Sequence, residues 1–79
     1  MHYVYRIRSQ TFPERHYTGF ASDLRQRLLD HNNGCCDYTR PFRPWSLEFY
    51  AAFQNPQRAR NFERYLKSAS GFAFANQRL

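Results

Sequence analysis

Apolar and polar side chains alternate at the start of the chain, and this pattern predicts a β-hairpin. Residues 2–9 would present two sets of side chains on opposite faces of a strand, Tyr3, Tyr5 and Ile7 on one face and Val4, Arg6 and Arg8 on the other. The segment 11–14 contains Pro13, which presets a turn φ and donates no backbone hydrogen bond. A second strand over 15–20 closes the hairpin. Gly19, near its end, permits a close backbone approach.

A helix is predicted to follow over residues 23–33. Ser22 is a favourable N-cap for it, and Asn33-Gly34 is a stop signal. Spacings of four and three residues form one stripe along this helix, made of Leu24, Leu28 and His31. Arg27 lies beside that stripe, one turn from His31, so the two side chains can act at the same place.

The second half of the chain predicts a loop, a strand and helices. The loop covers residues 34–44, and the strand covers residues 45–53. One face of this strand is expected to carry Leu47, Phe49, Ala51 and Phe53. Asn55-Pro56 starts a helix over 56–69, and a short closing helical turn is expected at 72–75. The order β-β-α-β-α-α predicts an α+β fold, with a small three-stranded antiparallel sheet flanked by helices.

Length, charge and cysteine content narrow the class of protein. The 79 residues predict a single domain over 1–79, whose core is largely aromatic. The net charge of +6, carried mostly by arginine, favours a nucleic-acid partner, although a solvated basic surface would give the same composition. No apolar run approaches the ~20 residues of a membrane helix, and the N-terminus does not resemble a signal peptide. Cys35 and Cys36 are adjacent, which disfavours a disulfide and indicates a cytoplasmic protein.

Two tyrosines, an arginine and a histidine are candidates for phosphodiester chemistry. Tyr5 and Tyr17 lie on the two arms of the hairpin, where their phenols could position a water molecule and contact a phosphate oxygen. Arg27 could stabilise the negative charge of a transition state, and His31 could act beside it as acid, base or phosphate contact. Each residue also has a structural explanation: half-buried strand aromatics, a solvated arginine and a core histidine.

Glu63 is the candidate metal ligand. Mg²⁺ often uses one or two carboxylates, with water molecules and substrate phosphates completing its coordination. The alternative is a surface ion pair between Glu63 and Lys67, four residues apart on the predicted helix. A zinc site at His31, Cys35 and Cys36 is disfavoured, because it offers three ligands at poor spacing.

Taken in order, these residues resemble the GIY-YIG nuclease superfamily, and in particular its small standalone bacterial members. The matching segments are Tyr17-Thr18-Gly19, Asp23-Leu24, Arg27-Leu28, His31-Asn32, Tyr38-Thr39, Pro44-Trp45, Leu47 and Glu63 with 67–71. The family's first name-giving triplet is represented by Tyr3, Val4 and Tyr5, and Thr18 replaces the isoleucine of the second. These departures fall at packing positions, and the reactive side chains are retained.

The resemblance implies metal-dependent cleavage of DNA. Glu63 would hold one Mg²⁺ or Mn²⁺ ion at the scissile phosphate. Tyr5, helped by Tyr17 or His31, would orient or deprotonate the attacking water, and Arg27 would stabilise the developing charge. The expected role is a structure-selective or weakly specific endonuclease of DNA repair or recombination.

No long insertion for reading a base sequence is evident, so binding is expected to rest on phosphate contacts and to weaken with salt. The predicted contacts are Arg25, Arg40, Arg43 and Lys67. The expected partner is branched or single-strand-containing DNA. Two alternatives remain, a non-catalytic nucleic-acid-binding module on the same scaffold and a subunit that docks through exposed aromatics.

Overall fold

The computed structural model describes residues 1–68, and it confirms the predicted α+β fold. Its elements are β1 (His2–Ser9), β2 (His16–Ala21), α1 (Leu24–Asn32), a 3-10 turn (Arg40–Phe42), β3 (Trp45–Phe53) and α2 (Pro56–Lys67). The predicted closing turn at 72–75 and the predicted last residue of the second helix lie outside the described residues. Within residues 1–68, no helix is long and apolar enough to cross a membrane.

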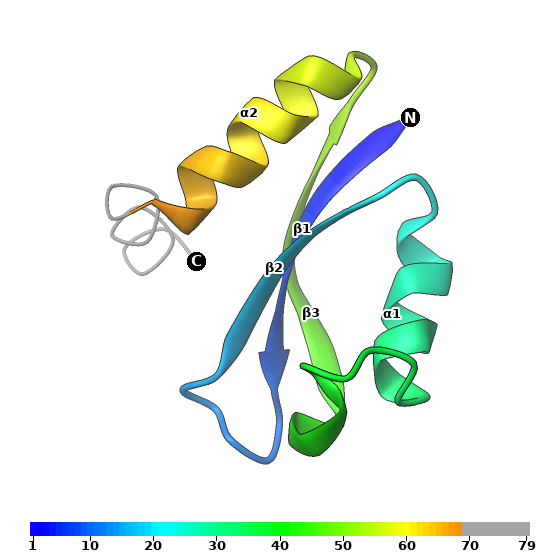
Figure 1. The fold of residues 1–79 in the computed structure, drawn as a ribbon, viewed down its shortest axis with the longest axis vertical. Coiled ribbons are helices and arrows are strands. Elements are labelled where there is room, and N and C mark those ends of the chain that lie inside the picture. The colour runs from blue at the N-terminus through cyan, green and yellow to red at the C-terminus, as the bar shows by residue number, and fades with distance from the viewer. Residues whose placement is uncertain (69–79) are drawn as a thin grey trace.

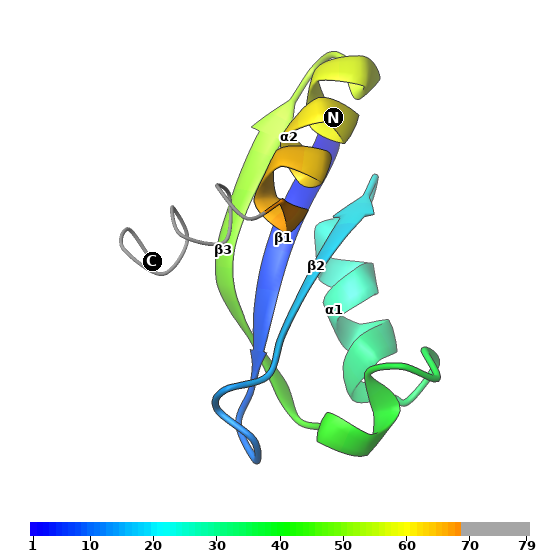
Figure 2. The ribbon, with the colours of Figure 1, turned by 60° about the vertical axis from the view of Figure 1, so that its left-hand side comes forward.

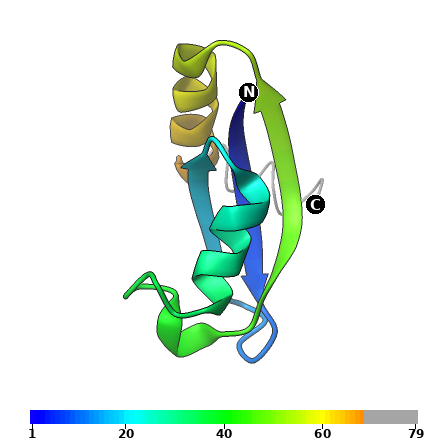
Figure 3. The ribbon, with the colours of Figure 1, turned by 90° about the vertical axis from the view of Figure 1, so that its right-hand side faces the viewer.

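The three strands form one antiparallel sheet with β1 in the centre, in the order β2-β1-β3. The hairpin explains the first pairing, and α1 with the loop after it carries the chain to the opposite edge, where β3 begins. The two helices lie on opposite faces of this sheet, α2 across its upper part and α1 on the other side (Figures 1, 2 and 3). β2 is an edge strand that packs against α2 on one face, whereas α1 packs mainly against β3 on the other face of the sheet.

Each face of the sheet has its own apolar cluster, because successive side chains of β1 point in opposite directions. The α1-side core is built on Tyr5, Ile7, Ala21 and Trp45, with Tyr17, Leu24, Leu28 and Phe42 packed against it. The α2-side core is built on Val4, Ala59 and Leu66, with Phe20, Phe49, Phe53 and Phe62 packed against it. The alternation predicted for β1 is thus the division between the two cores.

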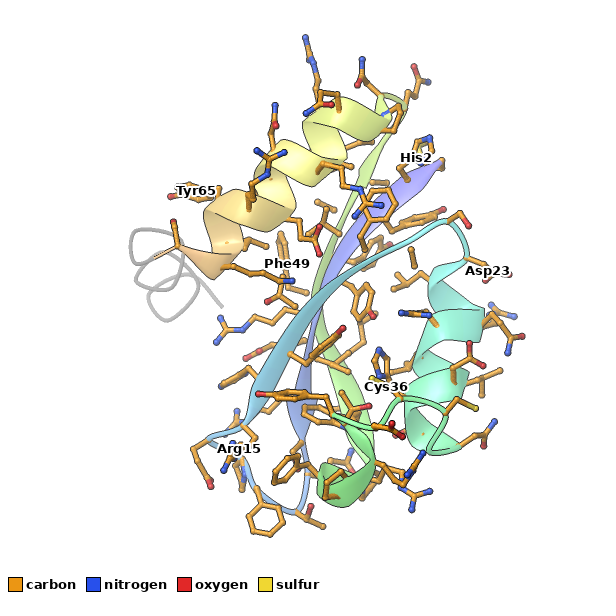
Figure 4. All side chains as sticks on the ribbon, in the orientation of Figure 1. His2, Arg15, Asp23, Cys36, Phe49 and Tyr65 are labelled. Atoms are coloured by element: carbon orange, nitrogen blue, oxygen red, sulfur yellow. The ribbon has the colours of Figure 1, made fainter. Side chains whose placement is uncertain are left out.

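The single face predicted for β3 is wrong, because the strand contains an irregularity at Glu48. Ile7 pairs with Leu47, but Arg6 pairs with Phe49, so one extra residue is inserted between them. Such an insertion shifts the alternation by one and moves the following side chains to the other face. Leu47 therefore lies on the α1 side, whereas Phe49 packs against Phe62 of α2, as Figure 4 shows for the labelled Phe49.

The extra residue also gives a buried arginine its counter-charge. Glu48 Oε2 lies 3.4 Å from Arg6 Nε and 3.0 Å from His16 Nδ1. Arg6 is only 4% exposed, and a charge removed from water to that degree needs a partner. The bulge therefore holds β1, β2 and β3 together through one carboxylate.

The start of α1 differs from the prediction by one residue. Asp23, not Ser22, is the N-cap, and its side chain accepts a hydrogen bond from the backbone N–H of Gln26. The carboxylate also places negative charge at the positive end of the helix dipole, which a serine hydroxyl does not. At α2 the predicted cap is confirmed, because Asn55 Oδ1 accepts from the backbone N–H groups of Gln57 and Arg58.

Replacing the two candidate caps of α1 should separate their contributions. Asp23→Ala is expected to lower the free energy of unfolding by about 1 kcal/mol, because it leaves a helix N–H without its acceptor. Ser22→Ala should change it by less than about 0.5 kcal/mol. Urea unfolding followed by circular dichroism measures both values. Equal losses in the two variants would contradict the assignment of the cap to Asp23.

Candidate active site

The hairpin places the two candidate tyrosines side by side on the α1 face. Tyr5 is paired with Gly19, and Tyr17 is paired with Ile7, so the two rings are diagonal neighbours with centroids 6.3 Å apart. Gly19 is required there, because a Cβ at this position would collide with the Tyr5 hydroxyl and ring. The predicted close backbone approach at Gly19 is thus the contact that lets Tyr5 lie across β2.

His31 joins the Tyr5 hydroxyl to the loop that follows α1. Its Nε2 lies 2.7 Å from the Tyr5 hydroxyl, and its Nδ1 lies 2.8 Å from Thr39 Oγ1. Tyr5 and His31 are each 1% exposed, and Thr39 is fully buried. These three side chains come from β1, α1 and the loop, so one buried hydrogen-bonded chain connects three elements.

The partners of this chain determine where its protons lie. The Tyr5 hydroxyl has one proton, and it goes to His31 Nε2 when the Nδ1 atom carries the ring proton. The Thr39 hydroxyl donates to the backbone oxygen of Cys36, 3.4 Å away, which leaves Oγ1 to accept from His31 Nδ1–H. His31 is therefore neutral, with Nε2 as acceptor. Burial, followed by the charge of Arg27, lowers the pKa of His31, in agreement with this state.

Burial also decides the protonation state of Tyr5. It raises the pKa of the Tyr5 phenol to about 12, even though Arg27 acts in the opposite direction. Tyr5 therefore keeps its proton at neutral pH and serves as a hydrogen-bond donor. Tyr17 is half-buried, and its ring packs on His31 with centroids 5.0 Å apart. Tyr17 is the tyrosine of the pair with access to a substrate.

Arg27 lies on the exposed side of this cluster and supplies its positive charge. The Tyr5 hydroxyl raises the pKa of Arg27 by accepting a hydrogen bond from it. The positive charge of Arg27 also acts on the thiol of Cys36, a loop residue labelled in Figure 4. Burial would raise the pKa of the Cys36 thiol, but hydrogen bonds from Thr39 and Tyr38, together with the charge of Arg27, outweigh it and lower the pKa. Four of the five predicted catalytic residues, Tyr5, Tyr17, Arg27 and His31, are thus in one place.

The loop is held in position by contacts with the end of α1 and the start of β3. The Asn32 side chain accepts from the backbone N–H of Trp45 at 2.6 Å and donates to its carbonyl at 3.1 Å. The indole N–H of Trp45 donates to the backbone oxygen of Thr39 at 2.8 Å. The Trp45 indole thereby anchors the backbone at Thr39, whose hydroxyl bonds to His31.

A groove of about 340 Å³ opens beside Tyr17, at the β2 edge of the sheet. It lies where the loop, the edge strand and the end of α2 approach one another. Its lining residues are Arg6, His16, Tyr17, Thr18, Tyr38, Leu66 and Lys67. The groove therefore connects the tyrosine cluster on one face of the sheet with α2 on the other.

Glu63 is near this groove but does not contact the other four predicted residues. Its Oε2 lies 3.3 Å from Lys67 Nζ, and its Oε1 lies 3.7 Å from Arg60 Nη1. Within residues 1–68, no hydrogen bond or ion pair joins Glu63 to Tyr5, Tyr17, Arg27 or His31. Lys67 is the connection, because it pairs with Glu63 and also lines the groove.

Glu63 could bind a metal ion only as its single protein ligand, with the other ligands supplied from outside the protein. In the part of the chain that the structure describes, no group of three or more histidine, cysteine, aspartate or glutamate side chains is arranged to hold a metal ion. A single carboxylate suits Mg²⁺ or Mn²⁺ when water and a substrate phosphate supply the remaining ligands. The Glu63 carboxylate would supply the protein ligand of such a site, in exchange for its present pairing with Lys67 and Arg60.

The predicted DNA contacts are spread over the surface. Lys67 lies at the groove, whereas Arg25 is beside Tyr50 on the α1 side. Arg40 and Arg43 lie in the loop, where they contribute to its structure. Arg40 donates to the backbone oxygen of Gly34 and pairs with Asp37, and Arg43 donates to the backbone oxygen of Arg40.

Several residues of the site were not assigned a role from the sequence. Thr39 and Tyr38 belong to a segment that matched the family signature, but periodicity gave no indication that one is buried against His31 and the other exposed at the groove. Arg6 and His16 appeared only as polar positions of strands. For Tyr38 and Thr39 a signal was available in the sequence, because the family signature places this pair between His31 and Pro44-Trp45.

Comparisons with known proteins identify the family of the chain. The family model of the GIY-YIG catalytic domain matches residues 1–76. A UPF0213 protein of Clostridium perfringens is 38% identical over 68 residues, which cover 85% of this chain and 71% of that protein. A UPF0213 protein of Staphylococcus saprophyticus is 33% identical over 70 residues, covering 87% and 83% respectively. No solved structure gives a significant match.

The chain therefore belongs to the GIY-YIG catalytic domain family. This family is a superfamily of nucleases, whose substrates are nucleic acids and which generally use a divalent metal ion. Its relatives here are small proteins of the UPF0213 group. The resemblance noted from the sequence is confirmed.

The lowered pKa of His31 makes the stability of the fold depend on pH. An unfolded chain protonates histidine near pH 6.5, whereas buried His31 does so only at lower pH. The free energy of unfolding should therefore be highest above about pH 6.5 and decline as pH falls through the lowered pKa of the folded state. Urea unfolding at a series of pH values measures the slope. His31→Gln should flatten it, and an unchanged slope in this variant would contradict the assignment to His31.

The Thr39 hydroxyl should be required for the state of His31. Thr39→Val keeps the shape of the side chain but leaves a buried N–H without an acceptor, which is expected to cost about 1–3 kcal/mol of stability. Thr39→Ser should retain most of the stability, because the serine hydroxyl can accept the same hydrogen bond. Nitrogen chemical shifts of the His31 ring report the tautomer directly. A ring that keeps its proton on Nδ1 in Thr39→Val would contradict this role.

Proposed function

We propose that this protein is a metal-dependent DNA endonuclease that hydrolyses phosphodiester bonds at the Tyr17 groove. The observation that carries the proposal is the cluster of Tyr5, Tyr17 and His31, with Arg27 beside Tyr5. Tyr17 brings this cluster to the groove, and Lys67, which pairs with Glu63, lines the same groove. Membership of a nuclease superfamily supports it. The proposed substrates are branched or single-strand-containing DNA, and the proposed role is in repair or recombination.

The burial of each residue suggests its part in the reaction. Arg27 and Tyr17 are accessible, so they would contact the phosphate and the attacking water. Tyr5 and His31 are buried and would act through them, because they hold the Arg27 guanidinium and the Tyr17 ring in place. Neutral His31, with its acceptor nitrogen on the Tyr5 phenol, can also take up a proton that passes through Tyr5.

Arg27 would stabilise the charge that develops on the phosphate. Its guanidinium is oriented by the Tyr5 hydroxyl before the substrate arrives, which is the kind of preorganised charge that lowers a barrier. Glu63 would hold the metal ion, which when bound polarises the scissile phosphate as a Lewis acid. Lys67 would then release Glu63 and contact a phosphate of the substrate.

One observation favours a second function, a nucleic-acid-binding module without catalysis. Glu63 is already paired with Lys67 and Arg60, and this arrangement satisfies the carboxylate in the absence of a metal ion. A module of this kind would bind DNA through the groove and cut nothing. The two functions differ in the role of Glu63, and that residue separates them.

Glu63→Gln should abolish cleavage without abolishing binding. We expect cleavage of labelled branched and single-strand-containing DNA, with Mg²⁺ or Mn²⁺ present, to fall about a hundredfold or more, because the metal supplies several kcal/mol of transition-state stabilisation. Denaturing gels measure cutting, and mobility shifts measure binding.

Glu14→Gln is the matched control, since Glu14 is an exposed acid in the hairpin turn outside the groove. If the unmodified protein and Glu63→Gln both bind DNA and neither cuts it, the result would favour the nucleic-acid-binding module without catalysis. Cutting that persists unchanged in Glu63→Gln would contradict the metal role of Glu63.

A further inference from the structure

The groove beside Tyr17 has an aromatic end formed by Tyr38. The Tyr38 side chain is 60% exposed, although tyrosine rings are large and largely apolar. Its ring lies 5.9 Å from that of Tyr17, at an angle of 41°. Tyr17 in turn packs on buried His31, so the pair is anchored on one side and open on the other. Tyr38 thus presents a flat ring at the rim of the candidate active site.

The ring of Tyr38 is held there by its neighbour in the sequence. Thr39 is fully buried and bonded to His31, and its backbone oxygen accepts from the Trp45 indole. These bonds hold the backbone next to Tyr38, and the Tyr38 ring packs beside that of Tyr17. An exposed ring on a rigid support can receive a stacked ligand at little cost in conformational entropy.

Basic side chains also line the groove. Lys67 lies on its α2 wall, with 54% of its side chain exposed. Arg6 and His16 lie on the strands below it, where the carboxylate of Glu48 holds both. The flexible ammonium of Lys67 is therefore the mobile cation of the groove, and Arg6 is a fixed one.

A nucleotide combines the two properties that these side chains recognise. Its base stacks on aromatic rings, and its phosphate binds lysine and arginine. The volume of about 340 Å³ lies within the range of pockets for small ligands, which begins at about 300 Å³. We propose that this groove is a subsite for one nucleotide next to the bond that is cut, with the base stacked on Tyr38 and its phosphate beside Lys67.

The subsite rests on the proposed function and adds a determinant of substrate choice to it. A base can reach the Tyr38 ring only after it leaves the stack of a duplex, and this step costs less where the base is unpaired. The subsite therefore favours DNA whose base next to the cut is free to turn outward. Stacking tolerates any base, so the contact selects flexibility rather than sequence.

Photo-crosslinking tests the position of the base without requiring cleavage. The full-length protein is mixed, in a chelator of divalent metals, with DNA carrying 5-iododeoxyuridine at successive positions, and the attached residue is identified by mass spectrometry. We expect one position to attach to Tyr38. Attachment only at other exposed aromatics, such as Tyr50, or no attachment at any position, would overturn the subsite.

Substitution of Tyr38 tests the energetic contribution of the stacked base. Tyr38→Leu should raise the Kd for DNA about tenfold, because one base stacked on one aromatic ring contributes in that range. Tyr38→Phe should bind nearly as tightly as the unmodified protein, because the ring is kept. Tyr50→Leu is the matched control, because Tyr50 is 54% exposed and lies against Tyr3, outside the groove. Urea unfolding confirms that each variant is folded.

DNA without a base at the crosslinked position completes the comparison. On this DNA the difference between Tyr38→Leu and the unmodified protein should disappear, because nothing remains to stack. A tenfold difference that persists on it would overturn the subsite. Cleavage without a Tyr38 crosslink would contradict the subsite alone, whereas a Tyr38 crosslink without any cleavage would contradict the nuclease function alone.

Discussion

The buried hydrogen-bonded chain from Tyr5 through His31 to Thr39 is the interaction on which the rest of the site depends. It joins β1, α1 and the loop, with separations of 2.7 and 2.8 Å and almost no exposure to water. In such surroundings an unsatisfied polar group is costly, so each member constrains the next. The orientation of Arg27, the packing of Tyr17 and the position of the loop all follow from this chain.

The position of β2 explains why an active site can form at its edge. α1 and α2 cover opposite faces of the sheet, and β2 forms one of its edges (Figures 2 and 3). The groove beside Tyr17 lies along this edge and includes Lys67 from α2. Tyr17, which packs on buried His31, and Lys67, which pairs with Glu63, thereby line the same opening, which suits the binding of a charged polymer along its length.

The prediction from sequence succeeded wherever a local pattern determined the outcome. The strand at His2–Ser9, the helix after Asn55 and the family signature all depend on residues close together in the chain. It failed at Glu48, because a bulge is a property of the pairing between β1 and β3 and not of β3 alone. It assigned the cap of α1 to Ser22, because serine is a good cap residue, and only the observed backbone places the cap at Asp23.

The sequence by itself determined the order of elements, the alternation that divides the two cores and the set of reactive side chains. Only the tertiary structure decided that Tyr5 is buried and Tyr17 accessible, that Thr39 orients His31, and that Tyr38 and Lys67 flank one groove. The physical reason is that burial and pKa depend on contacts between distant segments. A tyrosine on a strand has the same local pattern whether its hydroxyl meets water or a histidine 26 residues away.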